Sequence, residues 1–198
     1  NVGSDEIYAI AVDGLKTDYN VTMFQPIGIN NTFALAMLRS KATELGIETM
    51  SDLAGENGLR FGANHMFYTR EMDGYDKMLE IYGMSFAESL KMDTSLLYDA
   101  IEQGQLDVIV VYATDSLLKK YDMVILSDDQ EMFPAYHGAP ICRDDTLAAH
   151  PALSAVLDKL AGKIDDERMQ ELDYEIDVNN RTPEEVAKEF IEQENLLG

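Results

Sequence analysis

The apolar run within residues 106–115, LDVIVVYATD, limits the fold of this chain more than any other segment. Its hydrophobic residues follow one another without polar alternation, and this pattern predicts a strand that is buried on both faces. Such strands belong to parallel sheets covered by helices. Because segments with helical and strand patterns alternate along the rest of the chain, the sequence predicts an α/β fold.

Further helices are expected where apolar residues recur at helical spacing or where capping residues and a glycine bound a segment. The expected helices are residues 5–19, 51–54, 75–82, 95–103, 145–163, 165–174 and 183–197. The expected strands are residues 21–27, 59–62, 89–92, 106–115, 123–126 and 139–142. The last helix has the clearest start, because Thr182 can cap it, Pro183 suits its first turn and Glu185 completes a capping box.

Residues 28–37, GINNTFALAM, are predicted to begin another helix. Asn31 or Thr32 would cap this helix, and Gly46 would end it after Leu45. Phe33 would then lie in the first turn, where its ring could belong to the core or face a ligand.

Composition excludes several classes of function. The formal net charge of −22 makes nucleic acid an unfavourable partner, because phosphate groups would be repelled. No stretch of about 18 apolar residues is present, so no membrane span is predicted. Cys142 is the single cysteine, which rules out a disulfide within the chain.

The motifs of common enzymes are missing. The sequence contains neither a GxxxxGK[ST] loop nor a strand-linked GxGxxG. His65, His137 and His150 lack the paired spacing of a zinc site, so no metal is implied. A thiol nucleophile at Cys142, with His137 nearby in sequence, is a remote alternative to a small residue on a strand. We therefore expect neither catalytic residues nor a cofactor.

Aromatic residues occur where strands end and helices begin, which is where ligands bind in open α/β sheets. They are Phe33, Phe67, Tyr112 and Tyr136. Aromatic faces suit a quaternary ammonium group, which has no N–H to donate and is attracted by the ring quadrupole. Arg70 could hold a carboxylate on the same ligand. For any one of these rings, packing in the core remains an alternative.

Four motifs, in order along the chain, resemble one family. They are GINNTFALAM, FYTREMDGY, AIEQGQLDVIVVYATD and DDQEMFPAYHGAPICRDDTL. The sequence resembles the substrate-binding proteins of ABC importers for glycine betaine, choline and related quaternary amines. The resemblance implies a type II periplasmic-binding-protein-like fold with two lobes that close on the ligand. It also implies an extracytoplasmic protein, either periplasmic or held at the outer face of the membrane as a lipoprotein or permease fusion.

The resemblance also assigns ligand-binding residues by motif. Phe33, Tyr112 and Tyr136 would form an aromatic box for the quaternary ammonium group, with Phe67 beside them. Arg70 would hold a carboxylate. Asn31 and Thr32 would offer polar contacts or shape the chain there. The implied partners are a small quaternary amine and an ABC permease subunit in the membrane.

This sequence departs from the family pattern at three positions and leaves the ligand open. Phe33 stands where the family usually has tyrosine, Ala135 where proline is commoner, and His137 where glutamine is commoner. Glycine betaine and choline remain alternatives, as do carnitine or another amine. A sensor or interaction module that reuses the fold without transport is a further alternative.

The resemblance divides the chain into three parts. Residues 1–27 and 128–198 would form an incomplete first lobe, and residues 28–127 a complete and continuous second lobe. Family members begin with a further segment that completes the first lobe and supplies another aromatic residue of the box. We therefore expect this chain to have a weakened or open ligand site. Self-association that covers the unpaired strand edges and apolar faces is a second expectation.

Overall fold

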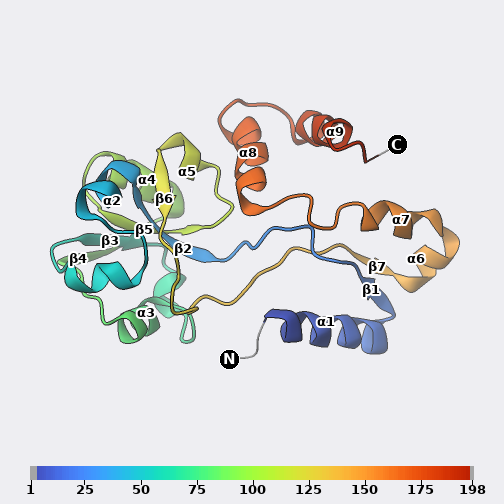
Figure 1. Cartoon of the computed structure of the whole chain (residues 1–198), viewed down its shortest axis with the longest axis horizontal. Helices are drawn as coiled ribbons and strands as arrows, with labels where there is room; N and C mark the ends of the chain where they lie inside the picture. Colours follow the sequence, from blue (N-terminus) through green and yellow to red (C-terminus); the bar gives the residue numbers. More distant parts are fainter. Residues whose placement is uncertain (1–3, 197–198) are drawn as a thin grey trace. The chain divides into compact units, whose positions relative to one another are not determined.

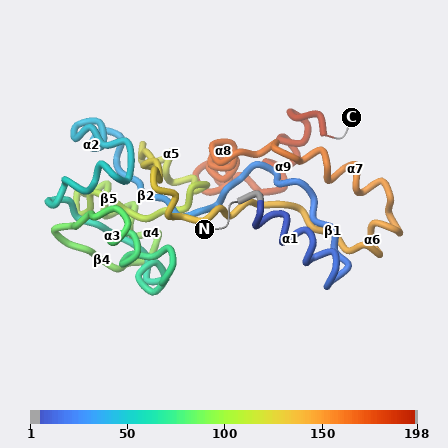
Figure 2. Tube along the Cα trace, turned by 60° about the horizontal axis from the view of Figure 1, so that its bottom comes forward, coloured from blue at the N-terminus to red at the C-terminus, as the bar shows by residue number. Residues whose placement is uncertain are grey.

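The computed structural model describes residues 4–196, and these residues form two compact units (Figures 1 and 2). The continuous unit is Thr32–Pro134. The split unit combines the described residues up to Asn31 with those from Ala135 onward. In Figure 2, the darkest blue and the orange-to-red segments belong to the split unit.

A five-stranded mixed sheet in the order β4-β3-β5-β2-β6 forms the centre of the continuous unit. Its strands are β2 (Phe33–Leu38), β3 (Arg60–Ala63), β4 (Glu88–Lys91), β5 (Val108–Tyr112) and β6 (Met123–Ile125). β3 pairs parallel with β4 and β5, whereas β2 runs antiparallel to β5 and β6. Its helical segments are α2 (Arg39–Leu45), η1 (Ser51–Gly55), η2 (Phe67–Thr69), α3 (Tyr75–Tyr82), α4 (Thr94–Glu102) and α5 (Leu117–Lys120).

Both faces of the central strands β2 and β5 are buried, and successive residues of a strand face opposite sides. On β2, Phe33 and Leu35 pack into the core cluster that includes Met78 of α3. Ala34 packs into a second cluster, which includes Leu97 of α4. Figure 1 shows α3 and α4 on opposite sides of the sheet. The strand predicted from the apolar run of residues 106–115 is confirmed as β5, buried on both faces.

The helix predicted after Asn31 or Thr32 is wrong in its first half. Residues Phe33–Leu38 form the strand β2, and only Arg39–Leu45 is helical, ending at Gly46 in the left-handed conformation as expected. Alanine, leucine and methionine favour helices as single residues, and a short apolar run cannot separate a buried strand from a buried helix. Pairing with β5 and β6 on both sides overrides that local preference.

The split unit contains a two-stranded antiparallel sheet and five helices within residues 4–196. The strands are β1 (Val21–Met23) and β7 (Ile141–Arg143). The helices are α1 (Ser4–Tyr19), α6 (Asp144–Ala149), α7 (Ala152–Asp158), α8 (Asp166–Asp177) and α9 (Pro183–Gln193). The predicted capping box is confirmed, since the Thr182 hydroxyl accepts from the Glu185 N–H and the Glu185 carboxylate accepts from the Thr182 N–H.

Two predicted elements of the split unit differ from the structure. The helix expected over residues 145–163 is broken into α6 and α7 at Pro151, which has no N–H to continue the helix. The strand expected over residues 21–27 ends at Met23, with Pro26 again lacking a donor. The expected end of the last helix at Leu197 lies outside the described residues.

In the structure, the boundaries between the units lie after Asn31 and after Pro134. The lobe boundaries expected from the sequence lie after residues 27 and 127. Short bridges explain why residues 28–31 stay with the split unit. Gly28 pairs with Ile164, and Asn30 pairs with His137.

Candidate functional site

Three of the predicted rings meet in the continuous unit. Phe33 is the first residue of β2 and Tyr112 the last residue of β5, and the antiparallel register places them directly opposite each other. Their rings stack with centroids 5.0 Å apart and an interplanar angle of 23°. Phe67, from η2, meets the Phe33 ring edge-on at 5.5 Å.

A fourth ring, which the sequence reasoning missed, completes this group. Phe133 lies 6.3 Å from Phe33 and 6.2 Å from Phe67 between ring centroids. Its backbone N–H donates to the Asp128 carboxylate at 2.8 Å, which holds the segment in place. We refer to Phe33, Phe67, Tyr112 and Phe133 as the ring cluster. Phe133 is an aromatic residue next to Pro134 in the MFPAY stretch. An aromatic residue close to proline in this stretch was also the reason for predicting Tyr136 as a site residue.

The rings of the cluster differ in accessibility. Phe67 is 0% exposed and Phe33 is 5% exposed, so in this structure both also belong to the hydrophobic core. Tyr112 and Phe133 are half-buried. A ligand that reached the cluster would therefore meet Tyr112 and Phe133 first, with Phe33 and Phe67 behind them.

Arg70 lies against the ring cluster, and its guanidinium has a carboxylate partner within the chain. Its Cζ is 5.3 Å from the centroid of the Phe33 ring, within the range of a cation–π contact. Nε donates to Asp73 Oδ1 at 2.6 Å and Nη2 donates to Asp73 Oδ2 at 2.5 Å. Asp73 is 4% exposed. The sequence reasoning assigned Arg70 to a ligand and missed Asp73, although the two are only three residues apart.

The turn that carries this pair is tightly built. The Asn64 side-chain oxygen accepts from the Phe67 N–H at 3.0 Å, which fixes the start of η2. A Cβ at Gly74 would lie 2.2 Å from the Arg70 carbonyl oxygen and 2.4 Å from that of Phe67, so only glycine fits there. These contacts fix the backbone from which both Arg70 and Asp73 extend.

Thr32 makes a structural contact at the edge of the same unit. Its hydroxyl donates to the Pro134 carbonyl at 2.9 Å, and its carbonyl accepts from the Ala113 N–H at 3.0 Å. The first bond joins the two ends of the continuous unit, and the second extends the pairing of β2 with β5.

Asn31 and Tyr136 belong to the split unit. The Asn31 N–H donates to the Tyr136 carbonyl at 3.1 Å, and the Tyr136 N–H donates to the Asn30 side chain at 2.6 Å. The side chain of Tyr136 is exposed, at 45%. Tyr136 is thus an accessible ring held by a well-bonded backbone.

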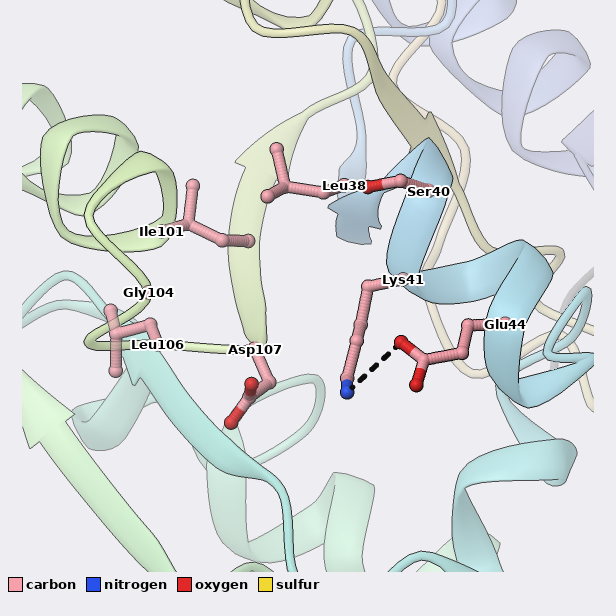
Figure 3. Close-up of a pocket in the computed structure, with 8 residues that line it drawn as sticks. All are labelled: Leu38, Ser40, Lys41, Glu44, Ile101, Gly104, Leu106 and Asp107. Atoms are coloured by element: carbon pink, nitrogen blue, oxygen red, sulfur yellow. Dashed lines mark hydrogen bonds and ion pairs between the residues drawn. The ribbon is translucent and has the colours of Figure 1, made fainter.

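The continuous unit also has a pocket of about 220 Å³, shown in Figure 3. Its lining combines apolar side chains with three charged residues: Leu38, Ser40, Lys41, Glu44, Ile101, Gly104, Leu106 and Asp107. Leu38 ends β2 and Asp107 precedes β5, so the pocket lies at the opposite end of this strand pair from Phe33 and Tyr112.

The charged groups of this pocket are already paired. Lys41 contacts Glu44 at 3.4 Å, the dashed line in Figure 3. Arg60 donates to both Asp107 oxygens, at 2.9 and 3.0 Å. Burial raises the pKa of Asp107, but the hydrogen bonds from Arg60 outweigh this effect and the pKa lies below its ordinary value. None of the described lining residues is aromatic, so the pocket lacks what a quaternary ammonium group requires.

Across residues 4–196, no group of three or more His, Cys, Asp or Glu side chains is arranged to hold a metal ion. Within the same residues, no helix has the length and apolar character needed to cross a bilayer. Cys142 is half-buried in β7, opposite Thr22.

Comparisons with known proteins agree with this architecture. A family model described as the substrate binding domain of ABC-type glycine betaine transport systems matches residues 4–193. The carnitine transport binding protein OpuCC of Listeria monocytogenes is 32% identical over 194 residues, covering 98% of this chain and 63% of that protein. The ergothioneine transport permease/ergothioneine binding protein EgtU of Helicobacter pylori is 34% identical over 182 residues, covering 91% of this chain and 33% of that protein.

A solved structure described as a glycine betaine/carnitine/choline ABC transporter covers 100% of this chain and 73% of its own, with 32% identity and a TM-score of 0.93. The predicted α/β fold of the periplasmic-binding-protein type is therefore confirmed, and so is the resemblance drawn from the four motifs. The relatives are transport binding proteins rather than enzymes. The chain belongs to the family of substrate-binding domains of ABC-type glycine betaine transport systems.

Proposed function

We propose that this chain is the solute-binding component of an ABC importer for quaternary ammonium compounds that also carry a carboxylate, such as glycine betaine or carnitine. The observation that supports this most directly is the ring cluster with the Arg70 guanidinium beside it. An aromatic surface and a guanidinium are the two groups that such a zwitterion needs, one for each of its ends.

The cationic end of the ligand would be held by the rings. A trimethylammonium group offers no N–H, so hydrogen bonds cannot hold it, and each ring face contributes roughly 0.5–2 kcal/mol depending on how much water is excluded. The Tyr112 ring is half-buried, and the Phe33 ring stacks against one of its faces. Tyr136, whose ring is exposed, is proposed as a further wall, and Phe67 as support behind Phe33.

The carboxylate end would be held by Arg70. A guanidinium has five N–H donors on two edges that each suit a carboxylate. We propose that Arg70 binds the ligand carboxylate while it keeps its two hydrogen bonds to Asp73. The relatives' named ligands, carnitine and ergothioneine, both combine a trimethylammonium group with a carboxylate. Choline has no carboxylate, which favours a zwitterion over choline as the ligand.

The remaining predicted residues have supporting roles in this proposal. The Thr32 hydroxyl is bonded to the Pro134 carbonyl, which suits a residue that shapes the start of β2 next to Phe33. Asn31 bonds to the backbone of Tyr136 and would fix the position of that ring. Phe133, from the ring cluster, joins the proposed binding residues.

The biological role would be binding rather than catalysis. Members of this family are extracytoplasmic binding proteins. Such a protein acts through differential affinity, since a ligand that binds one conformation more tightly raises its population, and that form would engage the permease subunit in the membrane. No cofactor or nucleic acid is part of this proposal.

The test is calorimetric titration of the complete gene product with glycine betaine, carnitine and choline. Tyr112→Ala and Tyr136→Ala should each weaken the binding of glycine betaine by about tenfold or more, because each removes a cation–π face. Tyr19→Ala is the matched control, since this tyrosine lies on α1 and is 71% exposed. Unchanged binding in the first two variants would remove the box assignment. A protein that binds none of the three ligands would refute the proposed function itself.

The same titration on the 198-residue chain tests a separate expectation. The chain covers 63% of the Listeria relative and 33% of the Helicobacter relative, and the sequence reasoning expects its site to be weakened. Micromolar binding by the 198-residue chain would contradict that expectation while supporting the proposed function.

A further inference from the structure

Asp73 is a buried carboxylate with no assigned role in ligand binding. It is 4% exposed, and it forms two short hydrogen bonds to the guanidinium that lies against the ring cluster. Burying a carboxylate costs free energy even when it is paired, and an apolar residue at the same position is often at least as stabilising. The presence of a charge at position 73 therefore suggests a role beyond stability. Its partner Arg70 is the proposed anchor for a ligand carboxylate.

An arginine beside a cation site raises an electrostatic problem. The Arg70 Cζ is 5.3 Å from the Phe33 ring centroid, so its positive charge lies close to the rings that would hold a quaternary ammonium group. Like charges placed side by side repel, and the repulsion grows as water is excluded. An uncompensated guanidinium there would favour the carboxylate of a ligand and disfavour its cation.

We propose that Asp73 is a specificity-determining residue that cancels the charge of Arg70, so that a cationic headgroup can bind beside the guanidinium. This inference rests on the proposed function. With both residues present the pair is neutral, and Arg70 still supplies directed N–H donors to a ligand carboxylate. Without the Asp73 carboxylate, the guanidinium keeps its positive charge and the rings stand next to one negative charge fewer.

The geometry separates this role from simple support. Two hydrogen bonds from Arg70 to Asp73 also orient the guanidinium, so any substitution of Asp73 could misplace Arg70 and weaken every ligand alike. Loss of charge compensation would instead act differently on two ligands with the same headgroup. Choline is a cation, whereas glycine betaine is a zwitterion whose carboxylate would gain from the uncompensated guanidinium. The ratio of the two dissociation constants therefore distinguishes the two roles.

The experiment measures binding of choline and glycine betaine by calorimetry to the complete gene product and to Asp73→Asn. This variant keeps the shape of the side chain and an oxygen that can accept from Arg70. The ratio of the choline Kd to the glycine betaine Kd should rise by about tenfold or more. Asp76→Asn is the matched control, because it removes one carboxylate from the same segment at an exposed position, and its ratio should stay at the wild-type value.

Each outcome decides the proposal. A rise in the ratio for Asp73→Asn alone supports it, and an equal loss of both ligands, with the ratio unchanged, overturns it while leaving the proposed function intact. A wild-type protein that binds glycine betaine but shows no measurable binding of choline also overturns it, because the neutral pair would then not admit a cationic ligand. If the wild-type protein binds neither ligand, the proposed function fails and this inference fails with it.

A double variant covers the case in which Asp73→Asn does not fold. Arg70→Gln with Asp73→Asn leaves no buried charge, so it should bind choline within about threefold of wild type and lose at least about tenfold in affinity for glycine betaine. Loss of choline binding by the folded double variant would overturn the proposal.

Discussion

The pairing of Arg70 with Asp73 makes a sharp prediction about stability. The Asp73 side chain is 5% exposed and that of Arg70 is 30% exposed. Replacing Arg70 by glutamine therefore leaves the buried Asp73 carboxylate without the opposite charge of this pair. Removing one partner of a buried pair costs about 3–5 kcal/mol. Because the Arg70 side chain is partly solvated, we expect a loss in the free energy of unfolding that lies below this range, about 2–3 kcal/mol.

Urea denaturation monitored by circular dichroism measures this loss. With a slope of about 1–3 kcal/mol per molar urea, the midpoint for Arg70→Gln should fall by about 0.7–3 M. Arg39→Gln is the matched control, since it removes the same charge from a pair whose side chains are 57% and 79% exposed. Exposed pairs contribute about 0–1 kcal/mol, so this variant should stay close to wild type. The reasoning is refuted if Arg70→Gln loses no more stability than Arg39→Gln.

Three further predictions concern other features of the fold. In the same denaturation assay, Gly74→Ala should lower the free energy of unfolding by about 2 kcal/mol or more, because the new Cβ would overlap backbone atoms. Gly55→Ala is the control and should be near neutral, because its Cβ would meet no described atom within 4 Å. Since the pKa of Asp107 lies below its ordinary value of 3.8, the stability contributed by its bonds to Arg60 is complete above that pH and lost as the pH falls below it. Asp107→Asn should therefore flatten the acid limb of a stability–pH profile, and an unchanged limb would exclude this contribution. The 198-residue chain should associate at high concentration through exposed apolar side chains such as Ile141, which is 59% exposed, and light scattering that shows only monomer would count against this.

Local signals in the sequence predicted those elements whose structure is set locally. The capping box at Thr182 needs only residues within one turn, and it formed as expected. The end of α3 at Gly83 is of the same kind. The strand Val108–Tyr112 was also predicted, because its apolar residues follow one another without polar alternation, as in a strand buried on both faces. The break at Pro151 was readable from the same local rules and was missed.

Elements whose structure depends on partners far away in the sequence were harder to predict. The run Phe33–Leu38 consists of phenylalanine, alanine, leucine and methionine, and this composition does not indicate that it pairs with β5 and β6. Likewise, the place of Phe133 in the ring cluster follows from the return of the chain to the edge of the continuous unit. Asp73 was missed for a different reason. Its spacing from Arg70 was visible, but a single role had been assigned to the arginine.

The correction of Phe33–Leu38 from helix to strand strengthens the case for the candidate site. In a strand, successive side chains face opposite sides of the sheet, so the antiparallel register alone decides whether the Phe33 and Tyr112 rings meet. A shift by one residue would send Phe33 to the face covered by α4 and leave Tyr112 on the face covered by α3. The stacked pair therefore follows from the sheet pairing that buries both faces of β2. The register that builds the core of the continuous unit is the same one that aligns the rings, and a change that slipped it would remove both together.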